Sequence, residues 1–226
     1  MSYDELNLRA QPKYDQSLSN MFSDTGYCFV HIPKNGGTSV ESVLFKGNRV
    51  GHRTWAQWYT AAPEQFVKWK KFAILRDPID RYLSAYDYLS KGGRNAIDAE
   101  FGRRFVKPYR DINSFTFSLK SKRRYFQVSQ YFHFRSQSDY VLSDNKICKV
   151  NHLLSFDNYS QELSGLLGMT TDSISHKNKT TGKRTLKAEL NTESIALLRE
   201  IYDKDFVLCE KGLSKGVKHD FYDEVI

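Results

Sequence analysis

Apolar runs alternate with helical patterns along this chain and set its expected order of elements. The runs YCFVHI (27–32) and KFAILRD (71–77) are rich in Phe, Val, Ile and Leu, and we predict both as buried strands. Weaker strand patterns are NRVGHR (48–53), YVLS (140–143) and KICKVNHLLSF (146–156). Strands that alternate with helices indicate a parallel sheet with right-handed crossovers.

Helix signals follow the two clearest strands. Thr38 and Glu41 form a capping-box pattern at the start of TSVESVLF (38–45). Asp77 is the expected N-cap of the next helix, with Pro78 at its first position. Further helices are predicted at 54–69 with a break near Pro63, at 157–168 between Asp157 and Gly168, and at 192–206.

This order predicts an α/β protein with a central parallel sheet. We expect an N-terminal arm at 1–25 and a single domain at 26–226, with a helical, basic insertion at about 91–138. The chain has 226 residues, of which 40% are hydrophobic and 14% aromatic, so it is long and apolar enough for a packed core.

Charge and cysteine content narrow the function classes. The formal net charge of +8 predicts an anionic partner, such as a nucleic acid, a membrane surface, an anionic polymer or a nucleotide. Three distant cysteines exclude a disulfide framework and a zinc site, and favour a reducing compartment. No segment has the apolar length of a signal peptide or a membrane span, so we expect a soluble, cytoplasmic protein.

The stretch PKNGGTS (33–39) joins the first strand to the first helix. A glycine turn that enters a helix presents backbone N–H groups at the positive end of the helix dipole, where anions bind. Taken alone, the two glycines also fit an ordinary tight turn beside a solvated lysine. The residues that we expect to contribute to an anion site are Lys34, Gly36, Gly37, Thr38 and Ser39.

A second strand end repeats this arrangement. In LRDPIDRYLSAY (75–86), Arg76 ends the strand and Ser84 lies in the second turn of the following helix. Ligands bind outside the carboxyl ends of parallel strands, so Arg76 is expected to face the same crevice as the Lys34 loop. Two phosphate sites on neighbouring strands suggest a bis-phosphorylated nucleotide. The alternative is a set of structural ion pairs, made by Arg76 and Arg81 with Asp77 and Asp80.

FVHIPKNGGTS (29–39) and LRDPIDRYLSAY (75–86) together resemble the nucleotide-binding signatures of sulfotransferases that use 3′-phosphoadenosine-5′-phosphosulfate (PAPS). The similarity is to the carbohydrate-type branch, sulfotransferase family 2, and it continues more weakly from about residue 27 to 210. The resemblance implies a sulfotransferase fold, which has three α/β/α layers and is similar to that of P-loop NTPases. It also implies PAPS as co-substrate and its bisphosphate PAP as product, with no metal. The implied acceptor is a hydroxyl group, expected on a glycan or glycolipid.

The resemblance also implies residue roles. Loop 33–39 wraps the 5′-phosphosulfate, with Lys34 as a catalytic residue that neutralises charge on the leaving group. Asn35 departs from the threonine usual after this lysine, but its amide still donates hydrogen bonds. The residues expected at the 3′-phosphate are Arg76 and Ser84, with Lys183 and Arg184 from the basic loop 176–184. Gln137 and Asp157 also match family positions, and we expect architectural roles for both.

Transfer to a hydroxyl requires a base that removes its proton as the sulfuryl group moves in line. His52 follows the expected second strand, and the corresponding family segment carries the histidine base. The alternative for His52 is packing beside Trp55. The other histidines are His133 as second choice, His176 as third, His31 with an expected structural role, and His152 and His219.

Two rival functions predict different features. A P-loop kinase or NTPase needs its lysine after the glycines and an acidic magnesium ligand, whereas PKNGGTS places Lys34 first. A nucleic-acid-binding module would use the aromatic and basic residues of 122–134, but it leaves the paired phosphate sites unexplained. The basic runs 120–126 and 182–187 fit a solvated surface, an acceptor groove or nucleotide closure. We therefore predict a PAPS-dependent O-sulfotransferase without a nucleic-acid partner.

Overall fold

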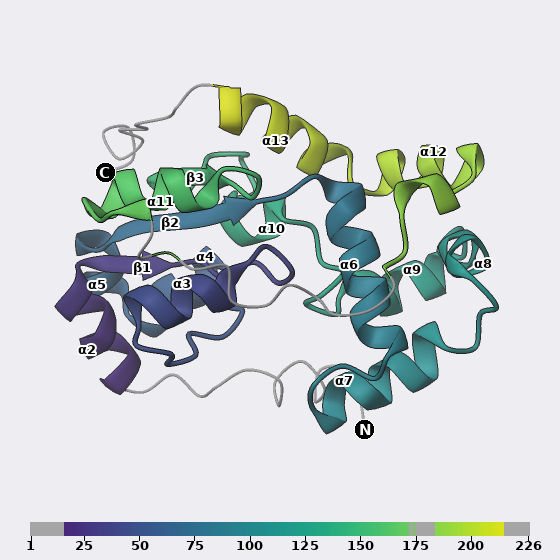
Figure 1. Cartoon of the computed structure of the whole chain (residues 1–226), viewed down its shortest axis with the longest axis horizontal. Coiled ribbons are helices and arrows are strands. Elements are labelled where there is room, and N and C mark those ends of the chain that lie inside the picture. Colours follow the sequence, from purple (N-terminus) through teal and green to yellow (C-terminus); the bar gives the residue numbers. More distant parts are fainter. Residues whose placement is uncertain (1–15, 172–173, 175–183, 215–226) are drawn as a thin grey trace. The chain divides into compact units, whose positions relative to one another are not determined.

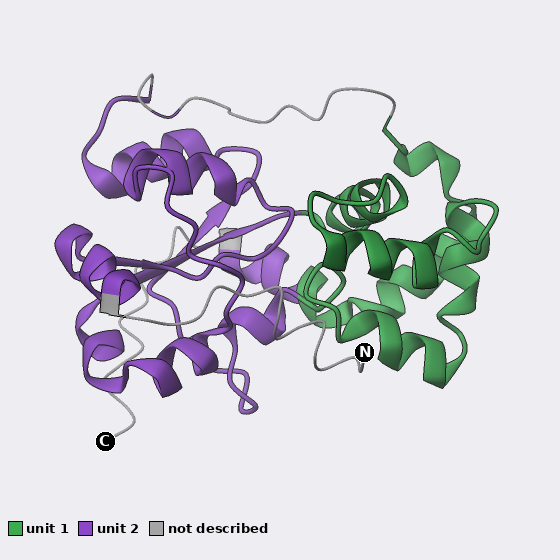
Figure 2. Cartoon of the chain, turned by 90° about the horizontal axis from the view of Figure 1, so that it is seen from below, with its two compact units in different colours: residues 1–10, 77–136, 180–206 green, residues 11–76, 137–179, 207–226 purple. Residues whose placement is uncertain are grey.

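The computed structural model describes residues 16–171, 174 and 184–214 (Figure 1). The chain divides into two compact units, drawn in green and purple in Figure 2. Unit 1 comprises residues 1–10, 77–136 and 180–206, and unit 2 comprises residues 11–76, 137–179 and 207–226. None of the helices in the described ranges is long and apolar enough to cross a membrane.

Unit 2 contains a three-stranded parallel sheet in the order β1-β2-β3. Its strands are β1 Tyr27–Phe29, β2 Lys70–Leu75 and β3 His152–Ser155. In the central strand β2, every residue after Lys70 is buried, which explains why its sequence reads as a continuous apolar run. The predicted α/β class with a central parallel sheet is therefore confirmed.

Helices pack against this sheet through an aromatic core. Phe22 of α2 is fully buried, and its ring centroid lies 5.0 Å from that of Trp58 and 5.2 Å from that of Trp69. Residues 16–25, at the end of the predicted arm, thus contribute to the core of unit 2. Its helices are α2 Gln16–Thr25, α3 Gly37–Leu44, α4 Trp55–Ala61, α5 Pro63–Lys68, α10 Ser138–Val141, α11 Tyr159–Leu167 and the main part of α13 Asp203–Ser214.

Several predicted elements of unit 2 are wrong in type or boundary. Residues 48–53 form no strand, because the N–H of Val50 donates to the Glu41 carboxylate and not to a neighbouring strand. In YVLS (140–143), Tyr140 and Val141 form the end of α10, and Leu142 makes only an isolated antiparallel bridge with Cys148. Helix α11 begins after Asn158 instead of Asp157, and it ends at Gly168 as predicted.

Unit 1 is helical in its described residues. Helix α6 begins as predicted, since the Asp77 side chain accepts a hydrogen bond of 3.0 Å from the N–H of Asp80. The predicted helix 192–206 is interrupted at Tyr202, whose backbone leaves helical geometry. The helices are α6 Pro78–Ser90, α7 Ala96–Phe101, the π-helix η1 Gly102–Val106, α8 Ile112–Ser118, α9 Lys122–Ser129, the short 3-10 helix η3 Lys187–Glu189 and α12 Thr192–Ile201.

A buried carboxylate organises the core of unit 1. Asp98 accepts hydrogen bonds of 2.6 Å from both Tyr88 and Tyr131, and one of 2.7 Å from the Asn95 amide. The Nε2 atom of His133 lies 3.3 Å from the same carboxylate. Burial alone raises the pKa of Asp98, but the contact with His133 and the tyrosine hydrogen bonds outweigh it and lower the pKa to about 2. His133, the second-choice base, is thus a buried partner of Asp98.

We predict that Asp98→Asn destabilises unit 1 by about 2–4 kcal/mol at neutral pH, because buried donors lose a charged acceptor. Urea unfolding followed by far-UV circular dichroism measures this change. The control Glu100→Gln removes a partly exposed carboxylate that pairs with the exposed Arg103, and it should change the free energy of unfolding by less than about 0.5 kcal/mol.

The same pair of proteins tests the pKa. The pKa of Asp98 in the folded state is about 2, below its ordinary value of 3.8, so the carboxylate stabilises the fold fully above pH 3.8. This stabilisation is lost as the pH falls through about 2. The stability difference between the native chain and Asp98→Asn should therefore shrink over this window, and a constant difference would contradict the assignment.

Candidate active site

The loop 33–39 leaves β1 and enters α3 at the carboxyl edge of the sheet, so the predicted order of strand, tight loop and helix is confirmed. Two of its residues have left-handed backbone conformations, Lys34 with φ 71° and Gly36 with φ 80°. Glycine adopts this region readily, whereas a lysine there carries strain of the kind found at ligand-binding loops. The first N–H groups of α3 lie at the positive end of its dipole.

The predicted capping box at the start of α3 does not form. The N-cap is Gly36, and Glu41 turns inward, where its Oε1 atom lies 3.1 Å from Nδ1 of His31. The same oxygen accepts a hydrogen bond of 3.0 Å from the N–H of Val50. Burial raises the pKa of Glu41, but the hydrogen bonds from His31 and Val50 lower it overall. This buried carboxylate therefore joins β1, α3 and the segment that leads to His52.

Close packing explains one of the two glycines. A Cβ atom on Gly37 would collide with the His31 imidazole, which stacks on Phe29 with a ring-centroid distance of 5.0 Å. His31 is 6% exposed, and its position agrees with the structural role expected for it. In the loop, the side chain of Thr38 is exposed, while Ser39 is 2% exposed.

The loop is tied to the end of β2 by a buried amide network. The Asn35 amide nitrogen donates to the carbonyl of Ile74 at 2.6 Å and to Oε1 of Gln137 at 2.7 Å. Gln137 also binds the Arg76 backbone on both sides, since its oxygen accepts from the N–H at 3.0 Å and its nitrogen donates to the carbonyl at 2.8 Å. Both amide hydrogens of Asn35 therefore point to protein acceptors, so its side chain belongs to this buried network.

The Arg76 side chain makes a further connection to the loop. Its Nη1 atom donates a hydrogen bond of 3.0 Å to the carbonyl of Lys34, and its guanidinium lies 4.3 Å from the centroid of the Phe156 ring. The stacked ring limits the orientations of the guanidinium. The two strand ends that carry the sequence signatures therefore meet in unit 2, as their places at one sheet edge predicted.

His52 lies beside the end of β1. Its Nδ1 atom is 3.1 Å from the carbonyl oxygen of His31, and the centroids of the two imidazole rings are 4.3 Å apart. A carbonyl oxygen only accepts, so Nδ1 of His52 carries a proton and donates it. In the neutral ring Nε2 then has the lone pair, which is the arrangement that a base requires. His52 is only partly buried.

The other predicted ligands lie in unit 1 or outside the described residues. Ser84 belongs to α6, and Arg184 is exposed. The residue after Arg184, Thr185, is held to α6 by the Asp87 carboxylate through hydrogen bonds of 2.9 and 2.6 Å.

The acids of the alternative ion-pair interpretation, Asp77 and Asp80, pair with a lysine. The Nζ atom of Lys187 lies 3.0 Å from Asp77 and 3.4 Å from Asp80. Lys183, His176 and His219 lie outside the described residues.

Sequence reasoning assigned no site role to Glu41 and Phe156, and it gave Gln137 only an unspecified architectural one. Glu41 was interpreted as a cap because its spacing from Thr38 fits one, and nothing local signals its pairing with His31. Gln137 and Phe156 follow Arg76 by 61 and 80 residues, counted along the sequence. Only the folded chain brings them to the end of β2.

The comparison with known families agrees with this geometry. The chain matches the model of a sulfotransferase family over residues 20–210 of its 226, and it belongs to this family. The resemblance to sulfotransferase family 2 found in the motifs is thus confirmed. As a member, the chain is an enzyme that transfers sulfuryl groups. No curated protein and no solved structure significantly matches the chain.

We predict that Gly37→Ala lowers the free energy of unfolding by about 1–3 kcal/mol, because the new methyl group displaces His31 from its place beside Glu41. Chemical denaturation measures the change. The matched control is Gly165→Ala in α11, where an added Cβ meets no atom within 4 Å. The control should be neutral or stabilising by up to about 1 kcal/mol. Equal effects of the two substitutions would contradict the packing argument.

Proposed function

We propose that this sulfotransferase uses PAPS and transfers its sulfuryl group to a hydroxyl acceptor, expected on a carbohydrate, with His52 as base. The observation that carries the proposal is the hydrogen bond of 3.0 Å from Arg76 to the Lys34 carbonyl, which joins the two nucleotide signatures. The buried amide of Gln137 supports this contact by holding the Arg76 backbone. Either signature alone is a common strand–loop–helix turn, whereas together they form one cationic edge.

Loop 33–39 has the features needed to bind the 5′-phosphosulfate. The first turn of α3 offers backbone N–H groups, and Lys34 supplies a full positive charge next to them. During transfer, negative charge builds on the oxygen that leaves sulfur, and a fixed array of donors stabilises this charge without reorganising. Lys34 and the start of α3 are the groups that we assign to this task.

His52 is the proposed base because its contact with the His31 carbonyl places a proton on Nδ1. Its Nδ1–H is held by the His31 carbonyl, so the Nε2 lone pair accepts the proton of the acceptor hydroxyl. As that proton moves, the acceptor oxygen forms its bond to sulfur, and the bond between sulfur and the phosphate oxygen breaks in line. The buried His31–Glu41 pair supports the backbone from which His52 is oriented.

The remaining nucleotide assignments rest on the family resemblance. Arg76 is the proposed 3′-phosphate ligand in unit 2, where Phe156 orients its guanidinium. Ser84, Lys183 and Arg184 stay predictions for the same phosphate. A glycan or glycolipid hydroxyl stays the expected acceptor.

We expect Lys34→Ala to weaken PAP binding by about 10- to 100-fold, since a charge-assisted hydrogen bond contributes about 1.5–3 kcal/mol. Isothermal titration calorimetry with PAP in the absence of magnesium measures this. The matched control is Lys46→Ala, because Lys46 is also a lysine with positive φ, 53°, but lies in the exposed turn after α3. The control should retain PAP affinity within about twofold.

Arg76→Ala should weaken PAP binding as well, because it removes both a phosphate ligand and the support of the Lys34 carbonyl. If neither Lys34→Ala nor Arg76→Ala alters PAP affinity, the nucleotide assignment is wrong. PAP should also stabilise the native chain against heat more than ATP does. Stronger thermal stabilisation by ATP than by PAP would favour a nucleoside triphosphatase.

We expect His52→Ala to lower turnover of labelled PAPS by about 10²- to 10⁴-fold while PAP affinity stays unchanged. An acceptor screen with labelled PAPS first identifies a substrate for this assay. The control His152→Ala changes a partly buried histidine at the start of β3 and should keep near-normal turnover. If His52→Ala keeps near-normal turnover, the base is a residue other than His52.

A further inference from the structure

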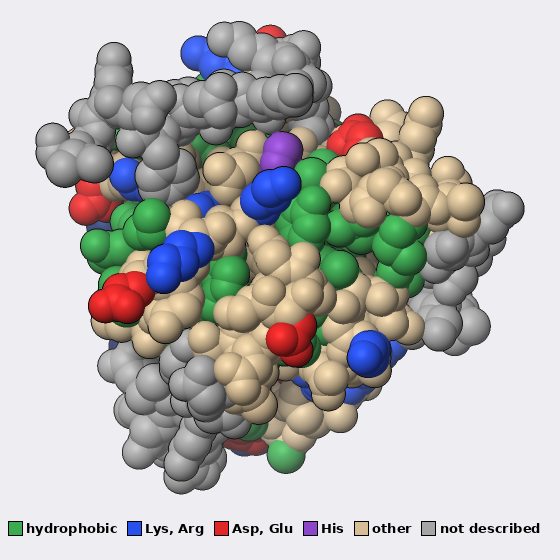
Figure 3. Space-filling model, turned by 90° about the vertical axis from the view of Figure 1, so that its left-hand side faces the viewer, with side chains coloured by type: hydrophobic (Ala, Val, Ile, Leu, Met, Phe, Trp, Pro, Cys, Tyr) green, Lys and Arg blue, Asp and Glu red, His purple; other side chains and the backbone are tan. Residues whose placement is uncertain are grey.

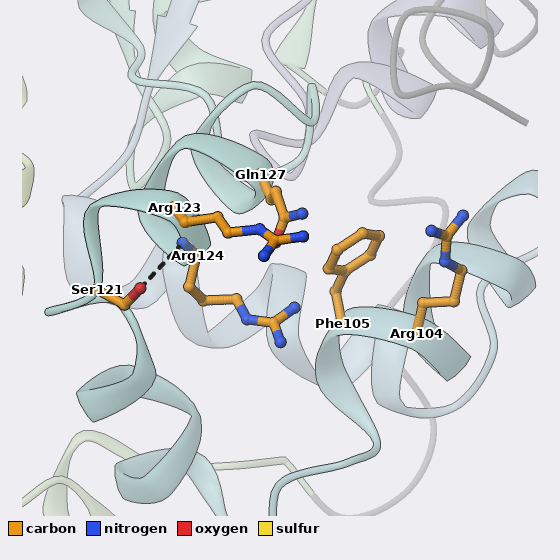
Figure 4. A pocket seen from close by; sticks show the side chains of 6 residues that line it. All are labelled: Arg104, Phe105, Ser121, Arg123, Arg124 and Gln127. Atoms are coloured by element: carbon orange, nitrogen blue, oxygen red, sulfur yellow. Dashed lines mark hydrogen bonds between the residues drawn. The ribbon is translucent and has the colours of Figure 1, made fainter.

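Three arginines of unit 1 gather around one hollow. On the face drawn in Figure 3, Lys and Arg side chains stand among hydrophobic, acidic and uncharged surface. In unit 1, by contrast, η1 and α9 enclose an open hollow with a volume of about 450 Å³ (Figure 4). Its lining consists of Arg104, Phe105, Ser121, Arg123, Arg124 and Gln127, so it contains three guanidinium groups and no carboxylate.

Local structure fixes the two walls of the hollow. One wall is the π-helix η1, and π-helical turns occur frequently at functional sites. Gly102 anchors this turn to α6, since a Cβ there would collide with the carbonyl oxygen of Leu89. The other wall is α9, whose N-cap Ser121 accepts a hydrogen bond from the N–H of Arg124. Arg123 and Gln127 are one helical turn apart and share a face of α9.

The buried ring of Phe105 orients two of the guanidinium groups. Phe105 is 5% exposed, and its ring centroid lies 5.2 Å from the guanidinium carbon of Arg104 and 5.4 Å from that of Arg124. Arg124 also lies 5.8 Å from the ring of Tyr109. Figure 4 shows Arg123 and Arg124 extending from α9 toward Phe105, with Arg104 on the other side of the ring. Side chains held in this way lose less entropy when they bind a ligand.

The nearby carboxylates pair with other basic residues. Arg103 binds both oxygens of Glu100, at 3.0 and 2.8 Å, and Arg110 binds Asp111 at 3.2 Å. Arg104 acts on the Glu100 carboxylate only through its charge, and the hydrogen bonds to this carboxylate come from Arg103. In the part of the chain that the structure describes, no ion pair joins a carboxylate to a hollow arginine. Three positive charges around one hollow repel one another, and a bound anion relieves this repulsion.

We propose that this hollow is a binding site for a sulfate or phosphate monoester carried on a small polar body such as a sugar ring. Guanidinium groups match tetrahedral oxyanions with paired N–H donors. The Gln127 amide and the Ser121 hydroxyl supply neutral partners for the hydroxyl groups of the ring. A volume of about 450 Å³ accommodates more than the anion alone, which favours an ester over the free ion. This inference rests on contacts within unit 1 and does not depend on the proposed nucleotide site.

The test compares two double variants of the full chain. Arg104→Ala/Arg123→Ala removes two charges from the hollow, and Lys107→Ala/Lys122→Ala removes two exposed charges from the same two segments outside it. Calorimetric titrations use a monosulfated hexosamine, a hexose phosphate, the unmodified sugars and a single-stranded RNA. Phosphatidylcholine vesicles with and without a phosphoinositide form a further arm, measured by co-sedimentation. PAP affinity is measured on both variants and should stay at the level of the native chain.

We expect the native chain to bind a monoester, and the arginine double variant to lose at least about tenfold in affinity. The lysine double variant should lose less than about twofold. Preference for the soluble esters or for the phosphoinositide vesicles identifies the source of the group. Three results overturn the proposal: no binding of a monoester beyond that of the unmodified sugar, equal losses in the two double variants, or stronger arginine-dependent binding of single-stranded RNA than of any monoester. If the native chain binds a monoester but does not bind PAP, only the nucleotide proposal is contradicted.

Discussion

The site in unit 2 depends on one buried amide. Gln137 is fully buried, and its three hydrogen bonds to Arg76 and Asn35 have lengths of 2.7 to 3.0 Å. Because a buried amide has no water to replace a lost partner, its preferred geometry is strongly enforced. The end of β2 and the loop after β1 are thereby kept in register. The strained backbone of Lys34 persists because this network and the Arg76 hydrogen bond over-determine it.

A second buried network orients the proposed base. Glu41 accepts from Val50, and its carboxylate lies 3.1 Å from His31, while the His31 carbonyl accepts from His52. The histidine next to the loop thus acts through its backbone and its packing, and it holds the Nδ1 atom of the more exposed His52. This division explains why a glycine is required at position 37: any side chain there would displace His31. Packing and proposed chemistry impose the same residue choice.

Basic residues in this chain have distinct roles that net charge does not distinguish. Lys34 and Arg76 belong to the loop and strand end of unit 2, where the backbone is fixed by hydrogen bonds. In unit 1, Arg103 is neutralised by its pair with Glu100, whereas Arg104, the next residue, lines the arginine hollow. Consecutive residues of a helical turn project in different directions, so these two neighbours have different surroundings. A charge count of +8 cannot resolve this difference.

The family follows from two sequence motifs, and the parallel α/β class and the two strand ends follow from apolar runs, capped helices and glycine turns, which are local patterns. The sequence also determined the cap of α6 by Asp77. The role of Glu41, whose spacing suggests a helix cap, and the helical state of Tyr140 and Val141 emerge only in the folded chain. The contacts of Gln137 and the tautomer of His52 likewise required the folded chain. These features depend on partners distant in sequence, and hydrogen bonds to such partners override local propensity when the groups are buried.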